Sequence, residues 1–204
     1  MTVLRKRAAT AHPVHDLIAE RWSPRAFADR EVSPEHLGSL LEAARWAASC
    51  FNEQPWSFAI ATRAEPERHA ALAGCLVPGN QAWAERAPVL MFSVARTTFA
   101  RNGMLNPHAW HDVGLATAQL CLQAVALGLV THQMAGYDAD RARAVLGLPE
   151  GQEPVAAIAL GHPADPATLD AETAAGESAP RARRPLAEIV HAGSWGPPAE
   201  LAPA

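Results

Sequence analysis

No Asp, Glu, Lys or Arg occurs between Val113 and Tyr137, and this charge-free stretch limits what the chain can fold into. A helix of that length is long enough to cross a bilayer. However, Gln119, Gln123 and other polar side chains interrupt the stretch, and polar, proline-rich segments lie elsewhere in the chain. We therefore predict a helix buried on most sides, in a core or between subunits, and no membrane partner.

Length and composition are those of one globular unit. The chain has 204 residues, of which 49% are hydrophobic and 19% charged, so it can bury a core and is too apolar to be disordered. The net charge is −4 and no basic stretch dominates, so nucleic acid is not an expected partner. Cys50, Cys75 and Cys121 lie far apart, which suits a reducing cytoplasm. We expect a single domain over residues 1–204 and a cytoplasmic location.

Helix and strand patterns alternate along the chain without forming clean β-α-β units. Leu37, Leu40 and Leu41 repeat with helical spacing behind a capping Ser33-Pro34 pair. We predict helices over 14–20, from 34 to a loop at 48–50, and over 66–76, 112–128, 138–146 and 185–190. We predict strands over 56–62, 88–95, 129–134 and 155–160. This order indicates an α+β fold in which helices cover a sheet, with a mobile surface loop over 163–180.

Common nucleotide and catalytic motifs are absent. There is no GxGxxG after a predicted strand, and no GxxxxGK, HExxH or GxSxG. These absences argue against a Rossmann dinucleotide site, P-loop phosphoryl transfer, a zinc protease helix and a serine hydrolase elbow. His108 and His111 are three residues apart without a further run of ligands, so no metal site is predicted.

The segment 21–27 carries the first group of candidate binding residues. In an extended chain alternate side chains share a face, so Arg21, Ser23 and Arg25 point together. Two guanidiniums and a hydroxyl on one face can bind a phosphate. A solvated surface loop with two arginines is the plainer interpretation.

Two further segments carry backbone that a ligand can approach. Small residues in 48–56 allow close contact with a flat ligand, and Pro55 is expected to hold Gln54 extended. In 131–138 a strand ends at a glycine turn, whose N–H groups are free to bond a ligand atom. The plainer interpretations are a helix-to-strand connection and a capped turn.

In order and spacing these segments resemble the nitroreductase family of FMN-dependent NAD(P)H oxidoreductases, over about residues 17–195. The matching motifs are RxSxR at 21–25, NxQPW at 52–56, Asn80-Gln81-Ala82-Trp83 followed by Ala87-Pro88, the apolar helix with MAGYD at 134–138, and 181–186. The resemblance implies a nitroreductase-like fold, with a central, mainly antiparallel sheet covered by helices. It also implies an intertwined homodimer, in which the C-terminal segment 185–204 wraps the partner subunit.

The resemblance also implies which residues bind FMN. Arg21 and Ser23, with Arg181 and Arg183, would hold the phosphate. Arg25 would reach the ribityl chain and the N1/C2=O edge of the ring, where reduced flavin is negatively charged. The expected cofactor-binding residues are Arg21, Trp22, Ser23, Arg25, Ala48, Ser49, Cys50, Asn52, Asn80, Met134, Ala135, Gly136, Arg181 and Arg183.

The remaining expected contacts lie around the flavin ring. Asn80 would bond the pyrimidine edge, and the backbone around Ala135 and Gly136 would donate to N5. Residues 48–52 would approach the FMN of the other subunit. Some relatives carry a lysine where Trp83 stands, so this aromatic side chain is expected to form a wall of the pocket instead.

The implied activity is hydride transfer from NADH or NADPH to flavin N5, and then to an acceptor such as a nitroaromatic or a quinone, in a two-step ping-pong cycle. The flavin supplies the chemistry, so no catalytic side chain is predicted. One alternative is a specialised flavin enzyme for dehalogenation or flavin cleavage, with residues 97–110 as the candidate lid. A second is a non-catalytic flavin-binding protein. A third alternative is a structural dimer without flavin. It is disfavoured because Arg21, Arg25, Arg181 and Arg183 are all present.

Overall fold

Four antiparallel strands form the centre of the structure, a computed structural model that describes residues 4–200. The strands are β1 (Trp56–Thr62), β2 (Val89–Arg96), β3 (Val130–Met134) and β4 (Gln152–Gly161). They lie in the order β1-β2-β4-β3, and Phe92 of β2 is paired with Ala59 on one side and Ala157 on the other. The mainly antiparallel sheet is therefore confirmed, and β4 begins three residues before the predicted strand.

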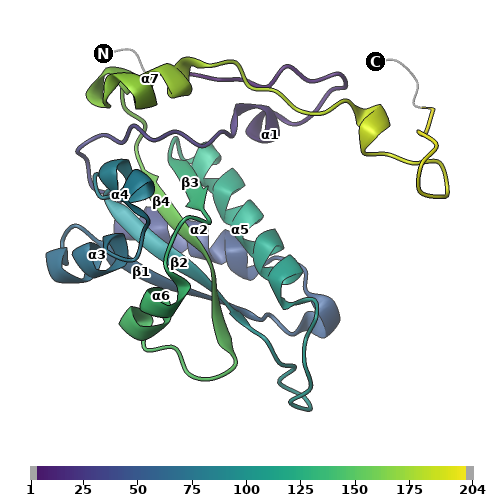
Figure 1. Ribbon diagram of the computed structural model, residues 1–204, viewed down its shortest axis with the longest axis horizontal. Coiled ribbons are helices and arrows are strands. Elements are labelled where there is room, and N and C mark those ends of the chain that lie inside the picture. The colour runs from purple at the N-terminus through teal and green to yellow at the C-terminus, as the bar shows by residue number, and fades with distance from the viewer. Residues whose placement is uncertain (1–3, 201–204) are drawn as a thin grey trace.

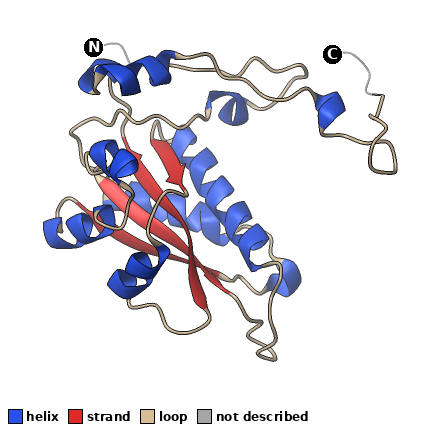
Figure 2. Cartoon of the chain, viewed as in Figure 1, coloured by secondary structure: helices blue, strands red, loops and turns tan. Residues whose placement is uncertain are grey.

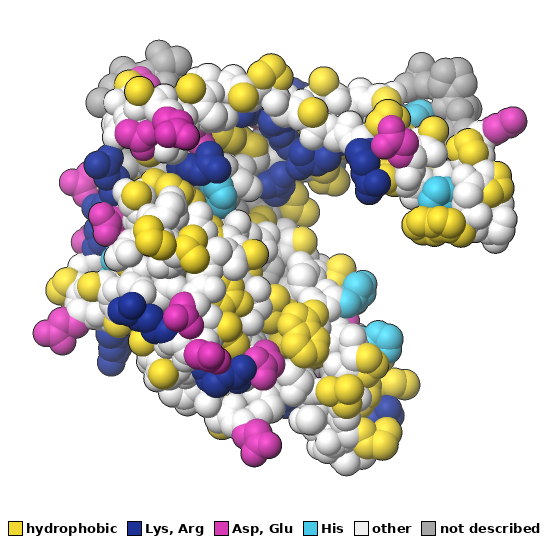
Figure 3. Space-filling view, viewed as in Figure 1, with side chains coloured by type: hydrophobic (Ala, Val, Ile, Leu, Met, Phe, Trp, Pro, Cys, Tyr) yellow, Lys and Arg dark blue, Asp and Glu magenta, His cyan; other side chains and the backbone are white. Residues whose placement is uncertain are grey.

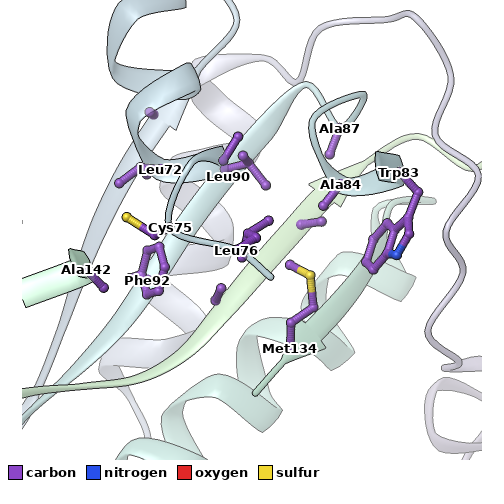
Figure 4. Packing of buried hydrophobic residues seen from close by; sticks show 14 of the residues in the cluster. Leu72, Cys75, Leu76, Trp83, Ala84, Ala87, Leu90, Phe92, Met134 and Ala142 are labelled. Atoms are coloured by element: carbon purple, nitrogen blue, oxygen red, sulfur yellow. The ribbon is translucent and has the colours of Figure 1, made fainter. Parts of the chain in front are cut away.

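Helices cover both faces of this sheet, as Figure 2 shows, which confirms the α+β prediction. The covering helices are α2 (Pro34–Arg45), α3 (Pro66–Ala73), α4 (Pro78–Ala84), α5 (Ala109–Ala126) and α6 (Ala139–Leu146). Figure 1 labels these helices around β2, whose alternate side chains pack in opposite layers. Val89 and Met91 pack with α2 and α5, whereas Leu90 and Phe92 pack with α3, α4 and α6, in the cluster of Figure 4.

The first part of the charge-free stretch lies in α5, which begins at Ala109 rather than at the predicted Asp112, and the rest includes β3. Ala116 and Leu120 are fully buried, and the α2 and α5 helices pack together over the sheet. The opposite side of α5, at Gly114 and Leu115, is exposed in the single chain. No helix in the described part of the chain is long and apolar enough to span a bilayer.

The prediction of a loop over 163–180 is wrong, because this segment contains two helices. A 3-10 turn, η2 (Pro166–Thr168), precedes the helix α7 (Ala171–Ser178). The Asp170 side chain accepts a hydrogen bond from the Thr173 N–H, which caps α7, and Glu177 is buried. The small and polar residues of this segment are typical of a loop, so the sequence did not predict the capped helix. Tertiary contacts hold this helix in place.

Other predicted helix boundaries also need correction. The helix expected over 66–76 ends at Ala73, because residues 75–76 turn across to meet 137–138, and a separate helix, α4, follows it. The first helix, α1 (Asp16–Glu20), starts after Val14, because the His15 side chain accepts a hydrogen bond at its N-terminus. The helix expected over 185–190 is only a 3-10 turn, η3 (Leu186–Glu188).

The two terminal segments cross one end of the sheet together (Figure 1). Arg181 of the C-terminal segment donates hydrogen bonds to the carbonyl oxygens of Lys6 and Ala19. Beyond this crossing the C-terminal arm, residues 185–200, runs out past the sheet, and Trp195 is 90% exposed. The arm therefore presents apolar side chains that its own chain leaves uncovered.

Gly161, at the end of β4, occupies a site with no room for a side chain. An added Cβ atom would lie 2.6 Å from Cδ of Pro88 and 3.1 Å from the Phe27 ring. We expect Gly161→Ala to lower the free energy of unfolding by about 2 kcal/mol through overpacking. Gly38→Ala is the matched control, because nothing lies within 4 Å of that exposed site in α2. Gly38→Ala should raise the free energy of unfolding by about 1 kcal/mol. Urea unfolding measures both variants, and equal stabilities would contradict the prediction.

Candidate functional site

The segment 21–28 runs extended beside the end of β4. Phe27 forms an antiparallel bridge with Pro163, which fixes the segment just beyond the end of β4. The Arg21 guanidinium donates to the Ser23 hydroxyl over 3.3 Å, so these two side chains share a side, as the alternation of an extended chain predicts.

Arg25, Trp83 and His132 come together from three separate parts of the chain. The Arg25 guanidinium carbon lies 5.9 Å from the centre of the Trp83 ring, which in turn lies 4.6 Å from the His132 ring. Nδ1 of His132 lies 3.0 Å from the Pro24 carbonyl oxygen and therefore carries the proton of this hydrogen bond. Burial, followed by the charges of the nearby arginines, lowers the pKa of His132 to about 4, so the ring is neutral at pH 7.

A turn after β3 is held against the start of α4. Nδ2 of Asn80 donates to the Gly136 carbonyl oxygen over 3.0 Å, and the Val77 N–H donates to the same oxygen. An added Cβ at Gly136 would lie 2.5 Å from Asn80 Nδ2, so the close approach requires glycine. The Ala135 and Gly136 N–H groups donate to no acceptor among residues 4–200. Met134 is buried in the core cluster, so only its backbone can face a ligand.

Arginines gather where the terminal segments cross. Burial lowers the pKa of Arg181, and the positive charges of Arg21 and Arg183 lower it further. Arg181 and Arg183 line a pocket of about 390 Å³ between the two terminal segments. Figure 3 shows dark-blue Lys and Arg side chains along the underside of the crossing terminal segments, facing the hollow above the sheet. Such a group of like charges favours an anion.

The segment 48–52 lies at the opposite end of α5 from the arginines. The Cys50 N–H donates to the Asp112 carboxylate over 3.0 Å, near the first turn of α5, where the 3-10 turn η1 (Cys50–Asn52) sits. Trp22, next to Arg21, lines a pocket with Val125 at the other end of α5. At 1.5 Å per residue, Asp112 and Val125 are about 20 Å apart along this helix. One chain therefore does not bring 48–52 to the other predicted site residues.

Gln54 is not extended as predicted, because its φ is 48°. Its N–H donates to the Ser49 hydroxyl, and its side-chain amide donates to the Asn52 carbonyl oxygen, each over 3.0 Å. These local hydrogen bonds outweigh the preference that Pro55 imposes on the residue before it.

The candidate lid, residues 97–110, is a short turn closed by a bridge between Thr98 and Leu105. The Glu53 carboxylate anchors it by accepting hydrogen bonds from the Ala100 N–H and from Arg96. Across residues 4–200, no group of three or more His, Cys, Asp or Glu side chains is arranged to hold a metal ion.

Comparison with known proteins decides the family. The sequence model described as the nitroreductase family matches residues 18–162. The chain belongs to the nitroreductase family. This confirms the resemblance and the nitroreductase-like fold.

Three relatives illustrate how far the similarity extends. A solved structure described as an oxidoreductase containing FMN shares 34% identity with this nitroreductase-family chain, with a TM-score of 0.88, over 97% of this chain and 100% of that one. A putative nitroreductase in complex with FMN from Desulfovibrio desulfuricans shares 30% identity, with a TM-score of 0.68, over 89% and 96%. An NADH dehydrogenase of Thermus thermophilus shares 29% identity, over 84% of this chain and 91% of the relative.

Two residues of this nitroreductase-family site were missed from the sequence. His132 lies within the charge-free stretch, and its position on a short strand before the glycine turn was a usable signal. Glu177 lies in an Ala-rich, acidic stretch that resembles a surface loop, and no local pattern distinguishes it. Only the packing of α7 on the segment 21–27 identifies Glu177.

Proposed function

We propose that this chain is an FMN-dependent oxidoreductase, which passes hydride from NADH or NADPH to a small acceptor such as a nitroaromatic or a quinone. The observations that carry the proposal are the charges of Arg21 and Arg183 near Arg181, and Arg25 over Trp83 of α4, the helix that also holds Asn80 against Gly136. The guanidiniums of Arg21, Arg181 and Arg183 fit a phosphate. The close backbone approach at Gly136, with the free N–H groups of Ala135 and Gly136, fits the edge of a flat ring. The relatives that contain FMN support the same cofactor.

Each group of residues then has a distinct task. Arg21 and Ser23, with Arg181 and Arg183, bind the phosphate, and Arg25 faces the pyrimidine edge. Since Nδ2 of Asn80 is engaged with Gly136, its Oδ1 is the atom that accepts from a ring N–H. Bound FMN supplies the hydride chemistry, while the protein orients it and places charge around it.

We further propose that two copies of the chain complete each site. The segment 48–52 lies about 20 Å along α5 from Trp22, the neighbour of Arg21, so we propose that it contacts the flavin of a second copy. The exposed side of α5 and the projecting C-terminal arm, with Ile189 and Trp195 uncovered, provide apolar surface for that contact. The arm is proposed to wrap the partner subunit.

The function is tested by the absorption spectrum of the purified protein, before and after NADH or NADPH is added without oxygen. We expect flavin bands that bleach with a reduced nicotinamide and return when a quinone is added. Bands that never bleach would indicate a non-catalytic flavin-binding protein. A chain that takes up no FMN on reconstitution would disprove the proposal.

A further inference from the structure

Glu177 of α7 is a buried acid in direct contact with Arg25. Its side chain is 1% exposed, and its Oε1 atom accepts a hydrogen bond from the Arg25 N–H over 3.1 Å. The same oxygen lies 3.6 Å from the Arg25 guanidinium. The second oxygen, Oε2, is buried without a hydrogen-bond partner among residues 4–200. Burying a carboxylate in this way costs stability, so the arrangement calls for a reason other than folding.

The charged groups facing Glu177 come from two other segments. Arg25 approaches it from the segment 21–27, and Lys6 of the N-terminal segment donates to its carbonyl oxygen over 2.6 Å. Burial is the largest influence on the pKa of Glu177 and raises it, and the Arg25 N–H and the charges of Arg25 and Lys6 offset part of that rise. The two cations favour the carboxylate anion.

Arg25 is held between this carboxylate and an aromatic ring. Its guanidinium lies against Glu177 on one side and over the Trp83 ring on the other. It remains 38% exposed, so it can still meet a ligand. The Glu177 carboxylate and the Trp83 ring, from different elements, thus restrict where the Arg25 guanidinium points. The carboxylate also places a negative charge beside it.

We propose that Glu177 is a positioning residue that aims Arg25 at the flavin and, as its counter-charge, weakens the preference of Arg25 for reduced over oxidised FMN. This inference rests on the proposed function. A full positive charge at the N1/C2=O edge favours the negative charge of reduced flavin. A carboxylate 3.6 Å from that cation offsets part of its field, and the burial of Glu177 limits how far solvent screens the effect. α7 is therefore part of the cofactor site.

The two parts of this role are separated by two variants. Glu177→Gln keeps an oxygen that can accept from the Arg25 N–H and removes the negative charge. We expect about tenfold tighter binding of reduced relative to oxidised FMN, which corresponds to a midpoint potential about 30 mV more positive. Glu177→Ala removes the hydrogen bond as well, so Arg25 loses its position. We expect it to bind both forms of FMN more weakly than Glu177→Gln does.

The test measures dissociation constants for oxidised and reduced FMN, and the midpoint potential, in the full chain. Glu172→Gln is the matched control, since it removes an exposed carboxylate from the first turn of the same helix. We expect this control to match the wild type. If wild type binds FMN but the potential of Glu177→Gln is unchanged, the counter-charge role is wrong. If wild type binds no FMN, the proposed function fails and this inference fails with it.

Discussion

Lowering the pH from 7 to 4.5 is expected to cost the wild type about 2 kcal/mol more stability than it costs a His132→Asn variant. Burial, and then the charges of Arg25 and Arg21, hold the pKa of folded His132 at about 4, against 6.5 in an unfolded chain. At a pH between these two pKa values, His132 is protonated in the unfolded chain and neutral in the folded chain. Stability is therefore fully present above pH 6.5 and falls as the pH drops toward 4.

Asparagine is the matched replacement because its side-chain amide can donate to the Pro24 carbonyl oxygen as Nδ1 of His132 does. The pKa values of His69 and His162 are also lowered by burial, but both residues remain in the variant, so their effects cancel in the comparison. Urea unfolding across this pH range, at equal protein concentration, gives the two profiles. Parallel profiles would show that His132 is not the group responsible.

Arg21→Ala is expected to weaken FMN binding by about 10- to 100-fold, the loss of one charge-assisted contact of roughly 1.5–3 kcal/mol. The fold should not weaken, because the charge of Arg21 repels Arg181 in the ligand-free protein. A residue with a purely structural role would instead lower stability when it is removed. Quenching of FMN fluorescence measures the affinity, and thermal unfolding without FMN measures the stability.

Arg68→Ala provides the control for a lost surface arginine. Arg68 is exposed on α3 and is ion-paired only with Glu65 among residues 4–200. We expect this variant to bind FMN as the wild type does. Sedimentation should find dimers of wild type and both variants, since Arg21 is assigned to the proposed phosphate site and not to the proposed dimer contact. An unchanged FMN affinity in Arg21→Ala would place the phosphate elsewhere.

Local signals in the sequence predicted most of the sheet and its covering helices. The strand predicted at 56–62 matches β1 to the residue, and the Ser33 and Asp138 caps placed the starts of α2 and α6. These features depend on neighbouring residues, so they can be read without the fold. The motif order likewise identified the family, which the comparisons confirmed.

By itself, then, the sequence determined the α+β class, the family and the residue types available for a phosphate and a flat ring. Only the tertiary structure decided how those residues meet. Arg25 and Glu177 are 152 positions apart, and their contact depends on α7 folding back over the segment 21–27. The placement of 48–52 at the far end of α5 was equally invisible to sequence patterns. Spacing along a chain reports which side chains share a local face, whereas long-range packing decides which charges become buried together.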